Sequence, residues 1–167
     1  MLSDYNVLSI DCDWITTLKN QREFLPFIIP ILNQNKKIIF EIDHHNINKY
    51  FNLKFEFCNL YNIDHHHDAG YQPEKNWLHE GNWLYHLVKI FPQKINYTWV
   101  CNSDSDPIRD EYHWDIFRDN IKNFKFDYHL NIINKNKFDI IFICCSPLYN
   151  NQLGITTYKI LESIYGT

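Results

Sequence analysis

Five consecutive side chains that can bind a metal ion occupy positions 64–68, in the order Asp-His-His-His-Asp. Asp64, His66 and Asp68 stand at alternate positions, so in extended or gently curving backbone their side chains share one side. Carboxylates and an imidazole that point to one place suit Mn²⁺, Fe²⁺ or Zn²⁺ better than Mg²⁺ or Ca²⁺. The alternative is a solvated histidine-rich loop. Similar motifs elsewhere in the chain decide between these two interpretations.

Two acidic pairs elsewhere in the chain have the same alternate spacing. Asp11 and Asp13 follow the short apolar run 7–10, which reads as a strand. Asp104 and Asp106 lie in Asn-Ser-Asp-Ser-Asp-Pro, a composition that also fits a plain turn. We therefore favour the first pair as metal ligands, and we expect the second pair to form a turn, with metal binding as its alternative.

The apolar run 37–42 ends in two histidines, His44 and His45, which follow Asp43. One of the two side chains should point toward the site and the other away from it. The remaining histidines near these motifs are expected to pack, to support the ligands or to lie on a helix surface: His65, His67, His79 and His86.

The elements that must position these side chains follow from apolar patterning. Strands are expected over 7–10, 37–42, 55–63, 96–101 and 139–144, and helices over 21–32, 47–51, 74–91 and 151–165. A short helix near 115–121 and an edge strand near 125–130 are weaker expectations. Apolar strands that alternate with helices predict a three-layer α/β/α fold with a mostly parallel sheet, in which functional groups collect beyond the carboxyl ends of the strands.

Composition restricts the class of protein. The 167 residues fit one domain, 1–167, and 45% of them are hydrophobic. A net charge of −4 without a basic stripe argues against nucleic acid as a partner. We expect no membrane span, no signal peptide and a cytoplasmic location. Five cysteines suit buried free thiols, and Cys144 and Cys145 are interpreted as the end of a buried strand, not as a nucleophile.

With His44 as the inward-facing histidine, six side chains could hold two divalent ions, with two carboxylates as bridges: Asp11, Asp13, His44, Asp64, His66 and Asp68. Two ions that share one water lower its pKa and stabilise charge as it attacks. This chemistry suits hydrolysis at a planar carbon, such as a guanidinium or an amide, or at phosphorus. The carboxylate-rich ligand set favours Mn²⁺ over Zn²⁺.

Several short motifs also occur in an order that resembles a known family. They are Ser-Ile-Asp-Cys-Asp-Trp at 9–14, Asp-His-His-Asn at 43–46, Ile-Asp-His-His-His-Asp at 63–68, Gly-Asn-Trp-Leu at 81–84, and the segment 138–149 that ends in Ser-Pro-Leu-Tyr. The third motif resembles the Asp-x-His-x-Asp signature of arginases and other ureohydrolases. The ordered set resembles the small arginase-like proteins of the UPF0489 family, which includes peptide arginases.

The resemblance implies an arginase-like fold, two Mn²⁺ ions, and conversion of a peptidyl arginine to ornithine and urea by a metal-bridging hydroxide. It favours the N-terminal acidic pair over the later one, and His44 over His45. It assigns catalysis to His44, Asp64 and His66 through the metal-activated hydroxide. It places His44 and Asp68 on one ion and His66 and Asp13 on the other, with Asp64 and Asp11 as bridges.

The chain departs from the family pattern around the expected substrate. Asn46 replaces an acidic residue, residues 150–151 are Asn-Asn where Thr-Pro is usual, and Leu148 stands where an acidic residue could contact a guanidinium. Four acidic residues could supply that contact instead: Glu41, Asp43, Asp104 and Asp106.

The sequence therefore predicts a manganese-dependent hydrolase, with Fe²⁺ or Zn²⁺ as alternative metals, that acts on a peptide or a small guanidinium substrate. The alternatives are a hydrolase of another amidine or amide, and an arginase-like binding module without activity.

Overall fold

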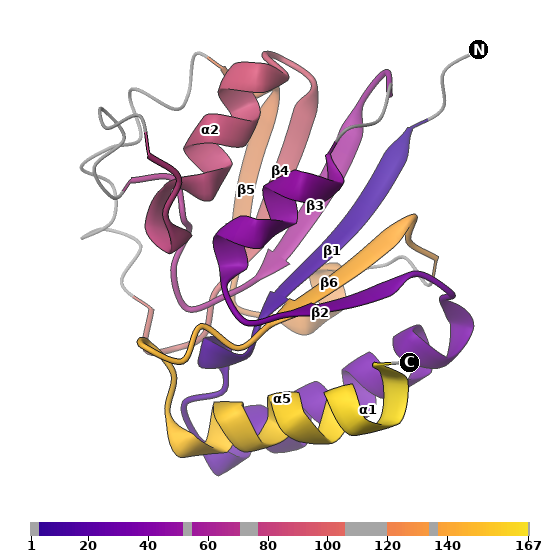
Figure 1. Cartoon of the computed structure of the whole chain (residues 1–167), viewed down its shortest axis with the longest axis vertical. Helices are drawn as coiled ribbons and strands as arrows, with labels where there is room; N and C mark the ends of the chain where they lie inside the picture. The colour runs from indigo at the N-terminus through magenta and orange to yellow at the C-terminus, as the bar shows by residue number, and fades with distance from the viewer. Residues whose placement is uncertain (1–3, 52–54, 71–76, 106–119, 134–136, 167) are drawn as a thin grey trace.

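The computed structural model describes residues 4–51, 55–70, 77–105, 120–133 and 137–166. The six strands of this part form one sheet in the order β2-β6-β1-β3-β4-β5, and every neighbouring pair is parallel. Helices lie on both faces of the sheet (Figure 1). The expected α/β fold in three layers is confirmed.

The strands lie close to the runs in which the sequence predicts them. Their bounds are β1 (Tyr5–Asp11), β2 (Ile38–Glu41), β3 (Cys58–Ile63), β4 (Ile95–Val100), β5 (Asn123–Asp127) and β6 (Ile140–Cys144). β6 is buried along its whole length because helices cover both of its faces, which explains its uninterrupted apolar sequence. β5 is the expected edge strand, whereas nearly all of the expected helix at 115–121 lies outside the described residues.

Two helical layers enclose the sheet (Figure 1). α1 (Leu18–Gln34) and α5 (Gln152–Tyr165) cover one face, and the 3₁₀ helix η2 (His44–Tyr50) and α2 (Trp83–Ile90) cover the other. Leu8 and Ile10 of β1 belong to the core beneath α1 and α5, while Val7 belongs to the core on the α2 side. None of the described helices is long and apolar enough to cross a membrane. All five cysteines are buried and free, as expected.

α1 extends beyond the expected range at both ends. Its first turn is closed by a capping box, in which Thr17 accepts from the backbone N–H of Asn20 and the Asn20 side chain accepts in return. Pro26 and Pro30 lie inside the helix, although the sequence analysis treats them as interruptions. Both prolines are on the exposed face, so water can bond the carbonyl groups that the missing N–H donors leave free.

The helix expected over 74–91 is confirmed in its second half only, since α2 (Trp83–Ile90) begins later than expected and residues 74–76 lie outside the described part. A short 3₁₀ helix, η3 (Glu80–Asn82), precedes it, and Asn82 breaks the helical path with ψ at 5°. The Asn82 side chain accepts from the backbone N–H of His79 at 2.7 Å and donates to the carbonyl of Trp77 at 3.2 Å. These bonds fold the segment before α2 into a compact turn. Trp77, expected on the apolar helix face, is consequently 45% exposed.

Candidate metal centre

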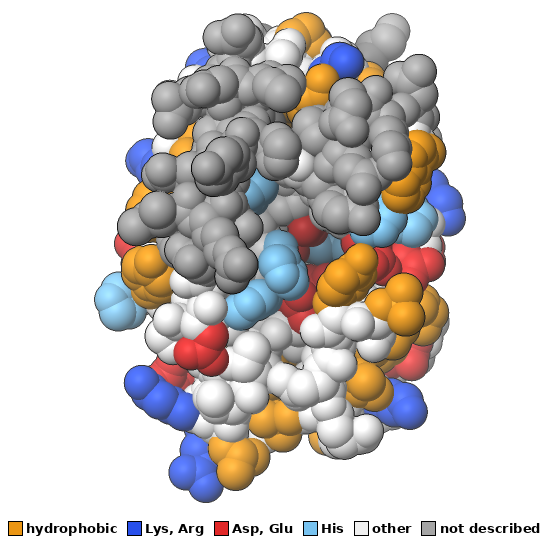
Figure 2. All heavy atoms as spheres, turned by 90° about the vertical axis from the view of Figure 1, so that its left-hand side faces the viewer, with side chains coloured by type: hydrophobic (Ala, Val, Ile, Leu, Met, Phe, Trp, Pro, Cys, Tyr) orange, Lys and Arg blue, Asp and Glu red, His pale blue; other side chains and the backbone are white. Residues whose placement is uncertain are grey.

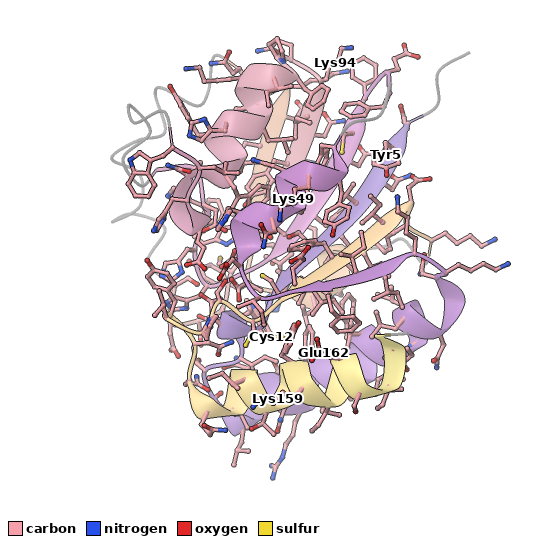
Figure 3. All side chains as sticks on the ribbon, viewed as in Figure 1. Tyr5, Cys12, Lys49, Lys94, Lys159 and Glu162 are labelled. Carbon is pink, nitrogen blue, oxygen red and sulfur yellow. The ribbon has the colours of Figure 1, made fainter. Side chains whose placement is uncertain are left out.

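The carboxyl ends of β1, β2 and β3 lie at one edge of the sheet because the strands are parallel. Figure 2 faces the side of the molecule at the left of Figure 1, and acidic and histidine side chains gather in the middle of this view. Tyr5 and Lys94, at the amino-terminal ends of β1 and β4, lie at the opposite end of the strands (Figure 3). The predicted ligands lie at the carboxyl ends of the strands, on the side that Figure 2 shows.

His44 begins η2, and its imidazole is completely buried. The ring packs between those of Trp83 and Phe142, with centroid distances of 4.8 and 6.0 Å. Its Nε2 atom lies 2.6 Å from Oγ of Ser9, a contact that fixes the ring orientation. Nδ1 is buried and makes no hydrogen bond of acceptable geometry. A buried, unpaired imidazole nitrogen is unusual unless it serves as a ligand.

Three carboxylates surround that nitrogen. Nδ1 of His44 lies 2.8 Å from Oδ2 of Asp68, 3.0 Å from Oδ2 of Asp64 and 3.4 Å from Oδ2 of Asp11. Adjacent ligands of an octahedral ion with bonds of about 2.1 Å stand about 3 Å apart. The separations and the donor types therefore fit a divalent cation held between these side chains.

The loop after β3 curls instead of continuing as extended backbone. Oδ1 of Asp64 accepts from the backbone N–H of His66 at 2.8 Å, and Oδ2 accepts from the side-chain amide of Asn62 at 3.1 Å. Asp68 has φ at 58°, in the left-handed region that aspartate tolerates better than most residues. Its Oδ2 accepts from the indole N–H of Trp83 at 2.5 Å. The curl and these bonds direct both carboxylates to the same place.

The other part of the centre comes from the end of β1. Asp11 is the last residue of β1, and Asp13 lies in the 3₁₀ turn η1 (Cys12–Trp14). Oδ1 of Asp13 accepts from the backbone N–H of His65 at 3.1 Å, and Oδ2 lies 3.2 Å from Nδ1 of His66. Asp13 therefore ties the end of β1 to the loop that follows β3.

Two groups of three ligand atoms result, each with all atoms within 4.8 Å of one another: His44 with Asp64 and Asp68, and Asp13 with Asp64 and His66. Asp64 belongs to both groups. Asp11 lies in a third group with His44 and Cys144. The six predicted ligands are thus brought together, with Asp64 between the two main groups. The buried acidic and histidine side chains form a candidate metal site.

Three groups of the site have pKa values above their ordinary values. Burial, followed by the charge of Asp68, raises the pKa of Asp64 to about 7. Burial also raises the pKa of Asp13 well above its ordinary value, with further contributions from nearby carboxylates. Burial lowers the pKa of His66, but its hydrogen bond with Asp13 and the surrounding negative charges raise it to about 10. Burial is the main cause for the two aspartates, and the neighbouring negative charges, which a divalent cation would neutralise, contribute to all three shifts.

The later acidic pair forms a turn where the structure describes it. The side-chain oxygen of Asn102 accepts from the backbone N–H groups of Asp104 and Ser105 at 2.9 and 3.0 Å, as in an Asx turn. Asp104 accepts from the Thr16 hydroxyl at 2.9 Å and joins no group of ligands among the described residues. Asp106 lies outside those residues.

The other histidines that the structure describes do not join the two main groups. Nδ1 of His65 lies 3.2 Å from the side-chain oxygen of Asn102, and His67 accepts from the backbone N–H of Ala69 at 3.0 Å. Both arrangements agree with the expected supporting and packing roles. His79 is the N-cap of η3, a correction of its expected place on a helix surface, whereas His86 lies on α2 as expected.

A further group of potential ligands was not foreseen. Ligand atoms of Asp43, His45 and Glu80 lie within 4.8 Å of one another. Burial, then a hydrogen bond with Asp43 and its charge, raises the pKa of Glu80 to about 7, and the charges of Asp11 and His44 also act on it. Glu80 therefore lies beside the centre, although the sequence analysis placed it on an ordinary helix.

The side chains that support the ligands were also missed. Ser9 orients His44, Asn62 bonds Asp64, and Trp83 bonds Asp68. A signal existed for Ser9, because it is a polar residue within the apolar run 7–10, and the structure buries both Ser9 and Asn62 completely.

The fold and this geometry stand without support from relatives. Compared with known proteins, the chain matches no family model, no curated protein and no solved structure. What indicates the chemistry of the site is the convergence of buried acidic and histidine side chains at the ends of β1, β2 and β3.

Proposed function

We propose that the chain is a metal-dependent hydrolase of the ureohydrolase type, which uses two Mn²⁺ ions to convert arginine, within a peptide, to ornithine and urea. The observation that carries this proposal is the pair of ligand groups that share Asp64. The resemblance of the ordered sequence motifs to the arginase-like UPF0489 family supports the same reaction. A cytoplasmic protein that acts on a peptide or small guanidinium substrate, without nucleic acid or membrane as a partner, would suit this role.

The residues present fit two divalent cations in number and in chemical type. His44 and Asp68 would hold one ion, Asp13 and His66 the other, and Asp64 and Asp11 would lie between them. Four carboxylates among six ligands favour Mn²⁺ over Zn²⁺, with Fe²⁺ as an intermediate choice. Two divalent cations would also neutralise the four carboxylates, all of which are buried.

Bound cations would supply Lewis-acid polarisation of the substrate and activation of water. The chain itself orients the ligands. When Nε2 of His44 carries the proton and bonds Ser9, Nδ1 offers its lone pair to the centre. Trp83 fixes Asp68 in the same way through its indole N–H. The side chain of His66 is 47% exposed, unlike that of Asp13 at 3%, so the substrate would approach from the His66 side.

Mass spectrometry of arginine-containing peptides incubated with the Mn²⁺-loaded protein tests the reaction. Conversion of arginine to ornithine lowers the peptide mass by ~42 Da, and metal-dependent hydrolysis requires that chelation abolish this change. Asp64→Asn should be inactive, while Asp104→Asn should act like the wild type. An unchanged mass across many peptides, with two metal equivalents bound, would refute the arginine reaction.

A second candidate is hydrolysis of another amidine or an amide. The position after Pro147 is Leu148, which is 86% exposed and carries no charge where the family has an acidic residue. This difference affects recognition of the guanidinium group of the substrate but leaves the metal ligands intact. Release of ammonia from neutral amides or small amidines, in the absence of ornithine formation, would favour this candidate. Metal binding without any turnover would favour an inactive binding module.

A further inference from the structure

A guanidinium that approaches two metal ions needs an anionic partner, because like charges repel strongly at such short distances. The sequence offers four acidic residues as candidates for this partner. The structure describes three of them, and their hydrogen bonds differ. Glu41 already accepts from the hydroxyl of Tyr50 at 2.8 Å and from the side-chain amide of Asn46 at 3.2 Å. Asp104 is held in the turn after β4 by its bond from Thr16. Both carboxylates therefore already accept hydrogen bonds from other side chains.

Asp43 is different. It is the N-cap residue of η2, a position where aspartate normally accepts from a backbone N–H of the first turn, yet its side chain makes no such bond. Its carboxylate instead lies within 4.8 Å of that of Glu80, on the turn before α2, and His45 belongs to the same group. Two carboxyl groups at this distance repel one another unless a proton or a cation lies between them. Within the part that the structure describes, no lysine or arginine pairs with either group.

The pair also lies next to the centre. Asp43 directly precedes the ligand His44, and the charge of His44 acts on Glu80. The ring of Tyr149, which is 51% exposed, lies 6.2 Å from that of the ligand His66 and 6.5 Å from that of His79, the neighbour of Glu80. An exposed aromatic side chain thus lies beside both a metal ligand and the residue that precedes Glu80.

We propose that Asp43 and Glu80 together form the contact for the cationic end of the substrate, beside the metal centre. Carboxylates from two different segments can each accept from one edge of a planar guanidinium, and such paired bonds are strong and directional. An incoming cation between the two carboxylates would offset their mutual repulsion. This inference rests on the proposed function, since it names the residues that would make that site selective for arginine.

The test compares two labelled peptides of one sequence that carry either arginine or its neutral isostere citrulline. Fluorescence anisotropy after rapid mixing measures their binding to the Mn²⁺-loaded protein before turnover. We expect the wild type to prefer the arginine peptide by about tenfold or more, as for loss of a charged contact. Glu80→Gln and Asp43→Asn should reduce this preference toward one. Asp43→Glu, which keeps the charge, should retain it.

Two matched variants and a metal measurement complete the test. Glu41→Gln and Asp104→Asn remove carboxylates that are hydrogen bonded to other side chains, and they should preserve the preference. All variants should keep the metal content of the wild type. Loss of a metal equivalent in Glu80→Gln would overturn the proposal and identify the group with His45 as a cation site. An unchanged preference in both Glu80→Gln and Asp43→Asn would also overturn it.

The outcomes separate this inference from the proposed reaction. A wild type that prefers arginine through Asp43 and Glu80 but forms no ornithine would support the contact and refute the reaction. Ornithine formation with an unchanged KM in both variants would support the reaction and refute the contact. A wild type without any preference for arginine over citrulline would refute the contact directly.

Discussion

Nδ1 of His44 lies 2.8 Å from Oδ2 of Asp68, although the two residues follow strands that are separated in the sheet by β6 and β1. The contact forms because η2 begins at His44, shortly after β2 ends at Glu41, and the loop after β3 curls back. It brings a buried nitrogen that makes no hydrogen bond of acceptable geometry next to a buried carboxylate, and this is the arrangement that a metal ion would complete.

Loss of the Ser9 hydroxyl should weaken the centre without removing a ligand. Ser9→Ala leaves Nε2 of His44 without its partner at 2.6 Å, so the orientation of the ring is no longer fixed. Removal of such a supporting bond typically lowers metal affinity by about 10- to 100-fold. Titration with Mn²⁺ followed by calorimetry measures the change. Ser163→Ala, on the exposed face of α5, is the control, and equal affinities in both variants would contradict this role.

Trp83→Phe should have a similar effect on the other side of the ion. The substitution keeps an aromatic ring beside His44 but removes the N–H that bonds Asp68 at 2.5 Å. We expect weaker Mn²⁺ binding in the same calorimetric titration. Trp14→Phe is the matched control, because the Trp14 indole N–H is buried without a partner. A loss of metal affinity in the control equal to that in Trp83→Phe would point to packing instead of the hydrogen bond.

The metal-free protein should lose stability as the pH rises. The pKa of Asp64 is about 7 in the folded state against an ordinary value of 3.8, and that of His66 is about 10 against 6.5. Between each pair of values the folded state binds more protons than the unfolded state, so raising the pH favours unfolding. The losses run from about pH 4 to 7 for Asp64 and from about pH 6.5 to 10 for His66.

Thermal unfolding at pH 5, 7 and 9 measures this trend. The midpoint should fall with pH in the metal-free protein, and Mn²⁺ should raise it most at pH 9, because bound ions stabilise only the folded state. Asp64→Asn should flatten the lower part of the profile. A metal-free protein that is more stable at pH 9 than at pH 5 would contradict the proposed charge arrangement.

Gly154→Ala should disturb the centre from a distance. A Cβ atom at this position of α5 would meet the backbone carbonyl of Cys12 in η1 and the side chain of Asn150. The carbonyl cannot move without moving η1, which carries Asp13. We expect a loss of roughly 1–3 kcal/mol in the free energy of unfolding, as for overpacked sites, together with weaker Mn²⁺ binding.

Chemical denaturation measures the loss, with Thr156→Ala on the exposed face of α5 as the control. Wild-type stability and metal affinity in Gly154→Ala would show that α5 and η1 do not pack this closely.

The sequence was sufficient to predict the layered fold and to name the six candidate ligands. Buried parallel strands carry continuous apolar runs, and their carboxyl ends must share an edge, so polar residues after 7–10, 37–42 and 55–63 converge. The order of the strands was not predictable from these patterns. It depends on how the long connections cross the sheet.

The predictions that differ from the structure do so for local physical reasons. The apolar spacing of residues 77–91 favoured one long helix, but side-chain bonds of Asn82 fold the first part into a turn, and this turn carries Glu80. Pro26 and Pro30 did not end α1, because both lie where water replaces the lost bonds. Supporting contacts such as Trp83 with Asp68 join distant parts of the chain, so no local pattern reveals them.

The metal content of the purified protein after reconstitution with Mn²⁺ tests the central claim most directly. Elemental analysis should give two equivalents for the wild type and for Asp104→Ala, and neither ion should remain in Asp64→Ala, because Asp64 belongs to both ligand groups. Less than one equivalent of Mn, Fe or Zn in the wild type, or loss of metal in Asp104→Ala with retention in Asp64→Ala, would contradict the two-metal site.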